Sequence, residues 1–290
     1  MIEITHHLVA RLAGLKDIEP FSCNTLGLIT SSTPRTLSYL ATPRFIEEAN
    51  NNKNIEALIT NHEIAPNISK SKILIIVDDP VWLFWTLFNR MVSIQESPAP
   101  TVIHQTANVH HRAYVSDFGV TIGENSIIEP NVTIHSNVTV GKNCLVRSGT
   151  VCGFDGFEHK KTNSGIISVR HDGYVFIEDD VEIGTLNSIA RGFSWRNTIV
   201  GSNTKTDSLV HIAHGVKIGH HCLITACAEI SGSADIGDGC WLGPNCSIIN
   251  GISLGKHVFV GIGAVVTKSF PDNSVVAGNP AKLLRTESCA

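Results

Sequence analysis

The chain has 290 residues, of which 17% are charged, and its formal net charge is −4. This length accommodates one large domain and one smaller domain. The weakly acidic balance offers no electrostatic footprint for nucleic acid or an anionic membrane. The most apolar window, residues 81–92, is too short to span a bilayer, and no basic region followed by an apolar run opens the chain, so we expect a cytoplasmic protein.

Residues 1–100 mix short helical and strand patterns and predict a small α/β domain. Helices are expected where a capping residue or a proline precedes an apolar stripe. Strands are expected at short apolar runs. The predicted helices follow Thr5, Pro43 and Pro80, the predicted strands cover 36–41, 56–60 and 72–77, and the linker is 97–100.

A six-residue repeat begins near Val102 and dominates the rest of the chain. Its most regular part places one large residue every six positions, at Val200, Thr206, Ile212, Ile218, Ile224, Ile230, Ile236, Leu242, Ile248, Leu254, Val260 and Val266. Neither a helix, with period 3.6, nor a strand, with period 2, makes this pattern. It predicts a solenoid over residues 101–270 in which three hexads form one triangular coil, followed by a tail at 271–290.

Two segments interrupt the repeat, at residues 155–174 and 191–197, and the second carries Phe193 and Trp195. Loops that leave a rigid scaffold often hold binding residues, although tolerated insertions are the competing interpretation.

Five of the chain's eight cysteines occupy packing positions of the repeat. Cys144, Cys222, Cys240 and Cys246 take the small-residue position, Cys152 takes a large-residue position, and no Cys-x-x-Cys occurs. We therefore predict buried thiols rather than disulfides or metal ligands.

The hexads resemble the left-handed parallel β-helix of the hexapeptide-repeat acyltransferases. This resemblance implies a mainly β protein with a small N-terminal α/β domain. It also implies a homotrimer with active sites between neighbouring solenoids.

Three segments look like the UDP-3-O-acylglucosamine N-acyltransferase family of lipid A biosynthesis. Residues 37–45 resemble its uridine-binding segment, in which Tyr39 and Phe45 would sandwich the uracil and Thr42 stands where the family usually has Asn. Residues 148–157, with Asp155 and Phe157, resemble the entry to the loop that covers the acceptor sugar.

The third segment, residues 207–216, is the most specific. The resemblance makes His214 the general base, Asp207 its supporting carboxylate, and the backbone amide of Gly232 the oxyanion donor. An imidazole titrates near pH 6.5, so it can accept a proton from an amine at neutral pH. Contact between Asp207 and His214 is expected across a corner or between subunits. An exposed turn histidine is the alternative for His214, because the chain has fourteen histidines, and the role of His211 is left open.

Two departures from the family bear on the donor. The turn at residues 248–252 lacks the family's second histidine, and Gly278, Asn279, Pro280, Ala281 and Lys282 resemble the CoA-binding end of small acetyltransferases. We expect an acyl-CoA or acyl carrier protein as co-substrate, with no tightly bound cofactor and no metal, and a nucleotide-linked amino sugar as acceptor. The lipid A enzyme itself is the nearest alternative.

Two other classes of function compete. The hexapeptide-fold carbonic anhydrases need three imidazoles on a metal, two of them five residues apart, and no two histidines here have that spacing. A non-catalytic binding solenoid is the other possibility.

Overall fold

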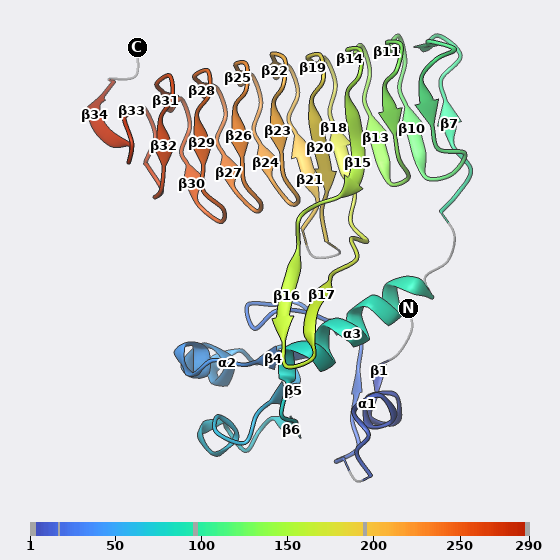
Figure 1. The fold of residues 1–290 in the computed structure, drawn as a ribbon, viewed down its shortest axis with the longest axis vertical. Helices are drawn as coiled ribbons and strands as arrows, with labels where there is room; N and C mark the ends of the chain where they lie inside the picture. Colours follow the sequence, from blue (N-terminus) through green and yellow to red (C-terminus); the bar gives the residue numbers. More distant parts are fainter. Residues whose placement is uncertain (1–3, 17, 95–97, 194–195, 288–290) are drawn as a thin grey trace. The chain divides into compact units, whose positions relative to one another are not determined.

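The computed structural model describes residues 4–16, 18–94, 98–193 and 196–287 (Figure 1). Its contacts divide the chain into two compact units. The first comprises Met1–Gln95 and Glu158–Arg170, and the second comprises Glu96–Phe157 and His171–Ala290. Part of the first interruption of the repeat therefore groups with the N-terminal unit.

The first unit is built on a parallel sheet in the order β3-β4-β5-β6. Its strands are β3 (Thr25–Leu26), β4 (Thr36–Leu40), β5 (Ile55–Thr60) and β6 (Ile73–Ile76), and β1 (Ile4–Thr5) pairs separately with β2 (Ser22–Cys23). Its helices are α1 (His6–Ala13), α2 (Ile46–Asn51) and α3 (Pro80–Ser93), with 3₁₀ turns η1 (Pro43–Phe45) and η2 (Ala65–Asn67). The helix predicted after Pro43 is thus split into η1 and α2.

Helix α3 begins as the sequence predicts. The carboxylate of Asp79 accepts a hydrogen bond from the amide of Trp82 at 2.9 Å, which satisfies one of the free donors of the first turn. Pro80 suits this position because its missing amide proton would have no partner there.

An antiparallel hairpin that the sequence analysis did not predict packs against α3. It consists of β16 (His159–Thr162) and β17 (Gly165–Ser168), within the stretch expected to be a loop. Asn89 of α3 holds the C-terminal end of the hairpin: its side-chain amide group donates to the Ser168 carbonyl at 2.8 Å and accepts from the Arg170 amide at 2.9 Å. The hairpin is therefore a structural part of the first unit.

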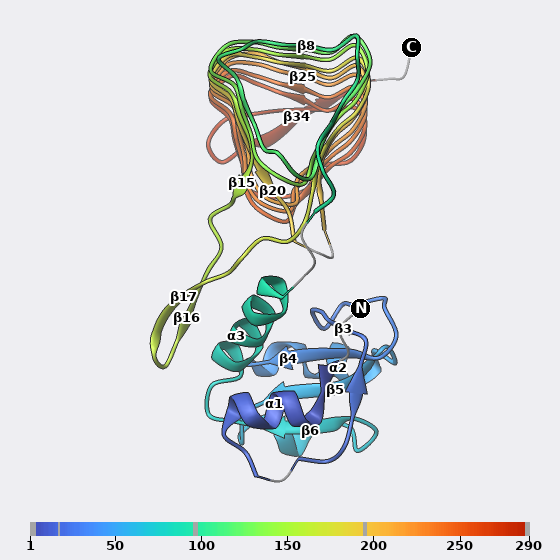
Figure 2. The ribbon, with the colours of Figure 1, turned by 90° about the vertical axis from the view of Figure 1, so that its right-hand side faces the viewer.

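The second unit is a parallel β-helix with a triangular cross-section (Figures 1 and 2). Each strand pairs with the strand one coil later, as in the pairs His211–Glu229 and Ile212–Ile230. Successive hexads occupy three different sheets, which is the arrangement that the repeat predicts.

The three sheets of the solenoid have these strands. The first sheet contains β7 (Val102–Ile103), β10 (Val120–Ile122), β13 (Val138–Val140), β18 (Val175–Ile177), β21 (Thr198–Val200), β24 (Lys217–Ile218), β27 (Asp235–Ile236) and β30 (Ser253–Leu254). The second contains β8 (Asn108–Val109), β11 (Ile127–Ile128), β14 (Leu145–Val146), β19 (Glu182–Ile183), β22 (Lys205–Thr206), β25 (Leu223–Ile224), β28 (Trp241–Leu242), β31 (Phe259–Val260), β33 (Ser274–Ala277) and β34 (Lys282–Thr286). The third contains β9 (Tyr114–Val115), β12 (Thr133–Ile134), β15 (Val151–Asp155), β20 (Ser188–Arg191), β23 (His211–Ile212), β26 (Glu229–Ile230), β29 (Ser247–Ile248) and β32 (Val265–Val266).

The interior of the solenoid is filled by the residues of the hexad pattern. From Val200 onward the large positions are buried, and so are nearly all the small positions two residues earlier, Ile212 and Val210 among them, whereas the large positions of the first coil, such as Ile103, are exposed or half-buried. The five cysteines assigned to packing positions are buried free thiols, which confirms their predicted place in the core. Burial raises the pKa of the Cys152 thiol to about 12, so this thiol remains protonated and unreactive.

The C-terminal segment differs from the separate tail that we expected. Strands β33 and β34 extend the second sheet: β33 pairs in parallel with β31, and β34 pairs antiparallel with β33. The buried side chains of Val275 and Val276 allow this segment to continue the sheet although it breaks the six-residue period. Within the described part of the chain, no helix combines the length and apolar character needed to cross a membrane.

Candidate active site

His214 lies in the turn between β23 and β24, at the corner where the third sheet meets the first. Ile212 points into the core, and Gly215 turns the chain with a φ of 67°. The imidazole lies between two glycines from other parts of the solenoid. A Cβ atom on Gly232 would lie 2.6 Å from the ring Cε1, and one on Gly156 would lie 2.9 Å from the ring Cδ2. Only glycine fits at these two positions without moving the ring.

Two buried aromatic rings form a wall beside His214. His171 and Phe193 stack with their ring centroids 4.4 Å apart and their planes at 24°. Both rings are nearly edge-on to His214, at 5.5 Å for His171 and 5.1 Å for Phe193. This packing holds the imidazole in one orientation.

The wall comes from the two interruptions of the repeat, 155–174 and 191–197. Both interruptions were predicted as candidate binding loops, but His171 was not singled out, and Phe193 was given no role. The break in period was the available signal. Trp195 of the second interruption lies outside the described residues.

Gly232 occupies the position one coil after His214. The amide of Ser233 donates to the His214 carbonyl at 2.9 Å, and the Gly232 carbonyl accepts from the Gly251 amide at 3.0 Å. In the described ranges, the amide proton of Gly232 has no acceptor. A free amide beside an imidazole is the pair of groups that an acyl transfer requires.

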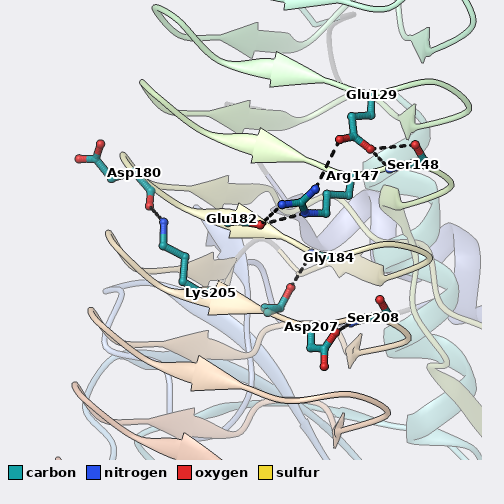
Figure 3. A network of polar contacts seen from close by, with 10 residues as sticks. Glu129, Arg147, Ser148, Asp180, Glu182, Gly184, Lys205, Asp207 and Ser208 are labelled. Carbon is teal, nitrogen blue, oxygen red and sulfur yellow. Dashed lines mark hydrogen bonds and ion pairs between the residues drawn. The ribbon is translucent and has the colours of Figure 1, made fainter.

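Asp207 lies at the preceding corner of the coil (Figure 3). Its side chain is exposed, and its carboxylate accepts from the Ser208 amide at 2.7 Å. Among the residues that the structure describes, this carboxylate makes no contact with His214, because β23 spans the face between the two corners. The chain therefore does not make the contact across a corner that we had considered.

His211 precedes His214 on the outer side of β23. Its Nδ1 atom lies 2.7 Å from the hydroxyl of Ser188, one coil earlier. Burial lowers the pKa of His211 from 6.5, and the Glu229 carboxylate one coil later partly offsets this effect.

Asp155 and Phe157, the other candidates from the first interruption, differ in their surroundings. Asp155 ends β15 and forms an ion pair with Arg191 at 2.6 Å. Phe157 is 87% exposed, so it is available to a ligand.

Tyr39, Thr42 and Phe45 line one pocket of about 580 Å³ in the first unit. The Tyr39 ring packs 4.6 Å from Phe84 of α3, whereas Phe45 is partly exposed. The hairpin contributes His159, Lys160 and Lys161 to the same pocket, which sequence reasoning missed. Lys160 also lies over the Trp85 ring at 5.1 Å and pairs with Glu158.

The segment Gly278–Lys282 comprises the turn between β33 and β34 and the first residue of β34. The Gly278 carbonyl accepts from the Val265 amide at 3.0 Å, and the Ala281 amide donates to the Val265 carbonyl at 2.8 Å. It thus contacts β32, three strands beyond β23 in the third sheet, or roughly 14 Å at the usual strand spacing. Within the described ranges, no group of three or more His, Cys, Asp or Glu side chains is arranged to hold a metal ion.

Comparisons with known proteins identify the repeat. Residues 119–153 and 197–232 match the bacterial transferase hexapeptide (six repeats), and residues 234–268 match the hexapeptide repeat of succinyl-transferase. The gap between the first two matches, residues 154–196, contains the first interruption and all but the last residue of the second.

Related sequences and solved structures agree with this match. The chain is 39% identical over 154 residues to a UDP-3-O-acylglucosamine N-acyltransferase of Methylorubrum extorquens, which covers 53% of this chain and 44% of that protein. A protein of the same name from Herminiimonas arsenicoxydans is 26% identical, and the match covers 95% of this chain and 86% of that protein. The chain thus spans less than half the length of the more identical relative. The UDP-N-acetylglucosamine acyltransferase of Campylobacter jejuni superposes with a TM-score of 0.54 at 19% identity, covering 64% of this chain and 73% of that one.

The fold is therefore a left-handed parallel β-helix, mainly β, with a small α/β unit at its N-terminus, as predicted. Three stretches of the solenoid thus match hexapeptide-repeat transferase models, and the sequence of the chain is similar to those of UDP-3-O-acylglucosamine N-acyltransferases.

Proposed function

We propose that this protein is an N-acyltransferase that moves an acyl group from a thioester donor to the amine of a nucleotide-linked amino sugar. The observation that carries the proposal is the His214 imidazole, held directly over the backbone of Gly232 at a corner of the solenoid. The similarity to the UDP-3-O-acylglucosamine N-acyltransferases supports the same reaction class.

The two groups have complementary tasks in acyl transfer. Neutral His214 accepts a proton from the sugar amine as its nitrogen attacks the thioester carbonyl, and the Gly232 amide donates a hydrogen bond to the resulting oxyanion. The intermediate then expels the thiolate, which takes the proton from the imidazolium. A positioned base contributes about 10²–10⁴ in rate, and one oxyanion donor about 10²–10³.

The acceptor would bind through its nucleotide in the pocket of the first unit. Tyr39 and Phe45 would stack on the base, with Thr42 beside it, and stacking of a base on an aromatic ring is worth about 1–3 kcal/mol. Lys160 and Lys161 supply positive charge for phosphates. Asp155 and Phe157 would contact the sugar.

The donor would be an acyl-CoA or an acyl carrier protein, and the turn Gly278–Lys282 would bind its pantetheine arm. Both are co-substrates of the cytoplasm, where we place the reaction. Asp207 would support His214 of a neighbouring protomer in a homotrimer, which is consistent with its exposure. The names of the relatives favour a second candidate, the UDP-3-O-(3-hydroxyacyl)glucosamine N-acyltransferase reaction itself.

Turnover of UDP- and dTDP-amino sugars with acetyl-CoA, hydroxybutyryl-CoA and long-chain acyl carrier protein tests the proposal. His214→Ala should reduce kcat about 10²–10⁴-fold. His220→Ala is the matched control, because His220 is an exposed turn histidine at the following corner. Wild-type turnover by His214→Ala would exclude His214 as the base. Sugar binding without turnover of any donor would indicate a non-catalytic solenoid instead.

A further inference from the structure

The side chain of Arg196 joins two successive turns at the His214 corner. Its Nε atom donates to the carbonyl of Gly215 at 2.5 Å, and a terminal nitrogen donates to the carbonyl of Ser233 at 3.1 Å. Gly215 follows His214 in the chain, and Ser233 follows Gly232. One guanidinium therefore bridges the turn that carries the imidazole and the turn that carries the free amide.

Arg196 is itself held firmly. Its main chain exchanges two hydrogen bonds of 2.9 Å with Phe193, the residue that forms part of the aromatic wall. The same terminal nitrogen pairs with the Asp235 carboxylate at 2.9 Å. A Cβ atom on Gly215 would lie 3.2 Å from the Cγ and Cδ atoms of Arg196, so the aliphatic stem packs closely on the turn. The bridge thus has a defined geometry and is only 22% exposed at the arginine.

The spacing that this bridge maintains is tight. A Cβ atom on Gly232 would approach the His214 ring to 2.6–2.7 Å at Cε1 and Nε2, so there is no room for a methyl group between the two turns. Any separation or sliding of the turns would change the distance between the proton acceptor and the oxyanion donor. A displacement of about 1 Å in such a site costs about 10²-fold in rate.

We propose that Arg196 is a positioning residue that sets the His214 imidazole relative to the Gly232 amide by holding both turns. This inference rests on the acyl transfer proposed for the same corner. Arginine suits the task because its planar guanidinium presents several donors in fixed directions, so it can bind two carbonyls at once. Lysine would keep the charge but would not provide the fixed fork that spans both turns.

The variants Arg196→Lys and Arg196→Gln, made in the full chain, test whether the fixed geometry of the guanidinium matters. The first keeps the positive charge and the second removes it. Both variants should lower kcat about 10- to 100-fold while KM stays within about 3-fold, because Arg196 orients the reacting groups without binding substrate. Arg147→Lys is the matched control. Arg147 likewise bridges separate coils, through Glu129 and Glu182 in the second sheet (Figure 3), and its replacement should leave kcat unchanged.

Chemical rescue distinguishes positioning from general damage. Millimolar guanidinium should restore much of the turnover of Arg196→Ala and none of that of His214→Ala. Wild-type kcat in Arg196→Lys, or a loss of kcat in Arg147→Lys equal to that in Arg196→Lys, would overturn the inference while leaving the proposed function intact.

Absence of turnover with every donor would count against the proposed function. Crystal structures of the wild type and of Arg196→Lys test the role of Arg196 even in that case. In Arg196→Lys the His214 ring should move relative to Gly232. An unchanged ring position would overturn the positioning role.

Discussion

At the scale of single residues, the corner around His214 is shaped by glycines on either side of the ring. Gly156 and Gly232 come from different parts of the chain, and a methyl group at either would collide with the imidazole. The backbone at the two glycines packs closely against the ring, and His171 and Phe193 contact it from the side. This arrangement limits the movement of the proposed base.

His211 provides a test of how burial acts on stability. Because burial lowers its pKa in the folded protein, the unfolded chain binds more protons around and below pH 6.5. The free energy of unfolding must therefore fall as the pH decreases through this range. We expect His211→Gln to reduce the decrease in Tm between about pH 7.5 and pH 5.5, because glutamine does not titrate.

Thermal unfolding of the two proteins across this pH range measures the effect. His104→Gln is the matched control, since His104 is exposed and its Nδ1 also lies near a hydroxyl, 2.9 Å from Thr106. Equal dependence of Tm on pH in wild type and His211→Gln would contradict the prediction.

At the scale of elements, the interruptions of the repeat supply what the regular coils lack. Regular hexads form two- or three-residue strands joined by tight turns. Their surface is smooth and offers few projecting groups to a ligand. The first interruption adds the hairpin β16–β17 and returns to the solenoid at His171, and the second adds Phe193 and Arg196. Both the wall beside His214 and the bridge under it thus come from segments outside the repeat.

One side chain of α3, that of Asn89, makes two of the contacts that attach the hairpin to this helix. Asn89→Ala removes two hydrogen bonds, each worth about 0.5–1.5 kcal/mol, to Ser168 and Arg170. Amide hydrogen exchange in β16 and β17 should become about tenfold faster or more, whereas exchange in the solenoid should not change. Ser93→Ala is the control, because the Ser93 hydroxyl bonds a carbonyl of its own helix. Unchanged exchange in the hairpin would show that other contacts hold it.

At the scale of the whole molecule, the proposed function requires a carboxylate beside His214, and Asp207 of the same chain does not reach it. Asp207 and His214 lie at different corners of the same coil, so a supporting role for Asp207 requires a second copy of the chain. We expect light scattering to give a mass three times the chain's 31.3 kDa. Asp207→Asn should lower kcat without changing this mass. A monomeric mass at full activity would exclude the role of Asp207 across subunits.

The repeat could be predicted from the sequence because its physical cause is local. Each hexad must place one large side chain inside and one small side chain near a corner, so the period is visible in any stretch of the chain, as at Val210 and Ile212. The same reasoning placed the buried cysteines and the start of α3 at Pro80. Prediction weakened where the period stopped, and the hairpin and the strands β33 and β34 were missed.

The sequence by itself determined the solenoid, its three faces and the position of His214 on a corner, since these follow from spacing along the chain. Only the tertiary structure decided which groups surround that imidazole. His171, Phe193, Arg196 and Gly156 are brought to it by segments without a period, whose paths depend on packing against distant coils. It likewise decided that Asp207 lies apart from His214, because β23 crosses one face of the coil between their two corners although the residues are close in the chain.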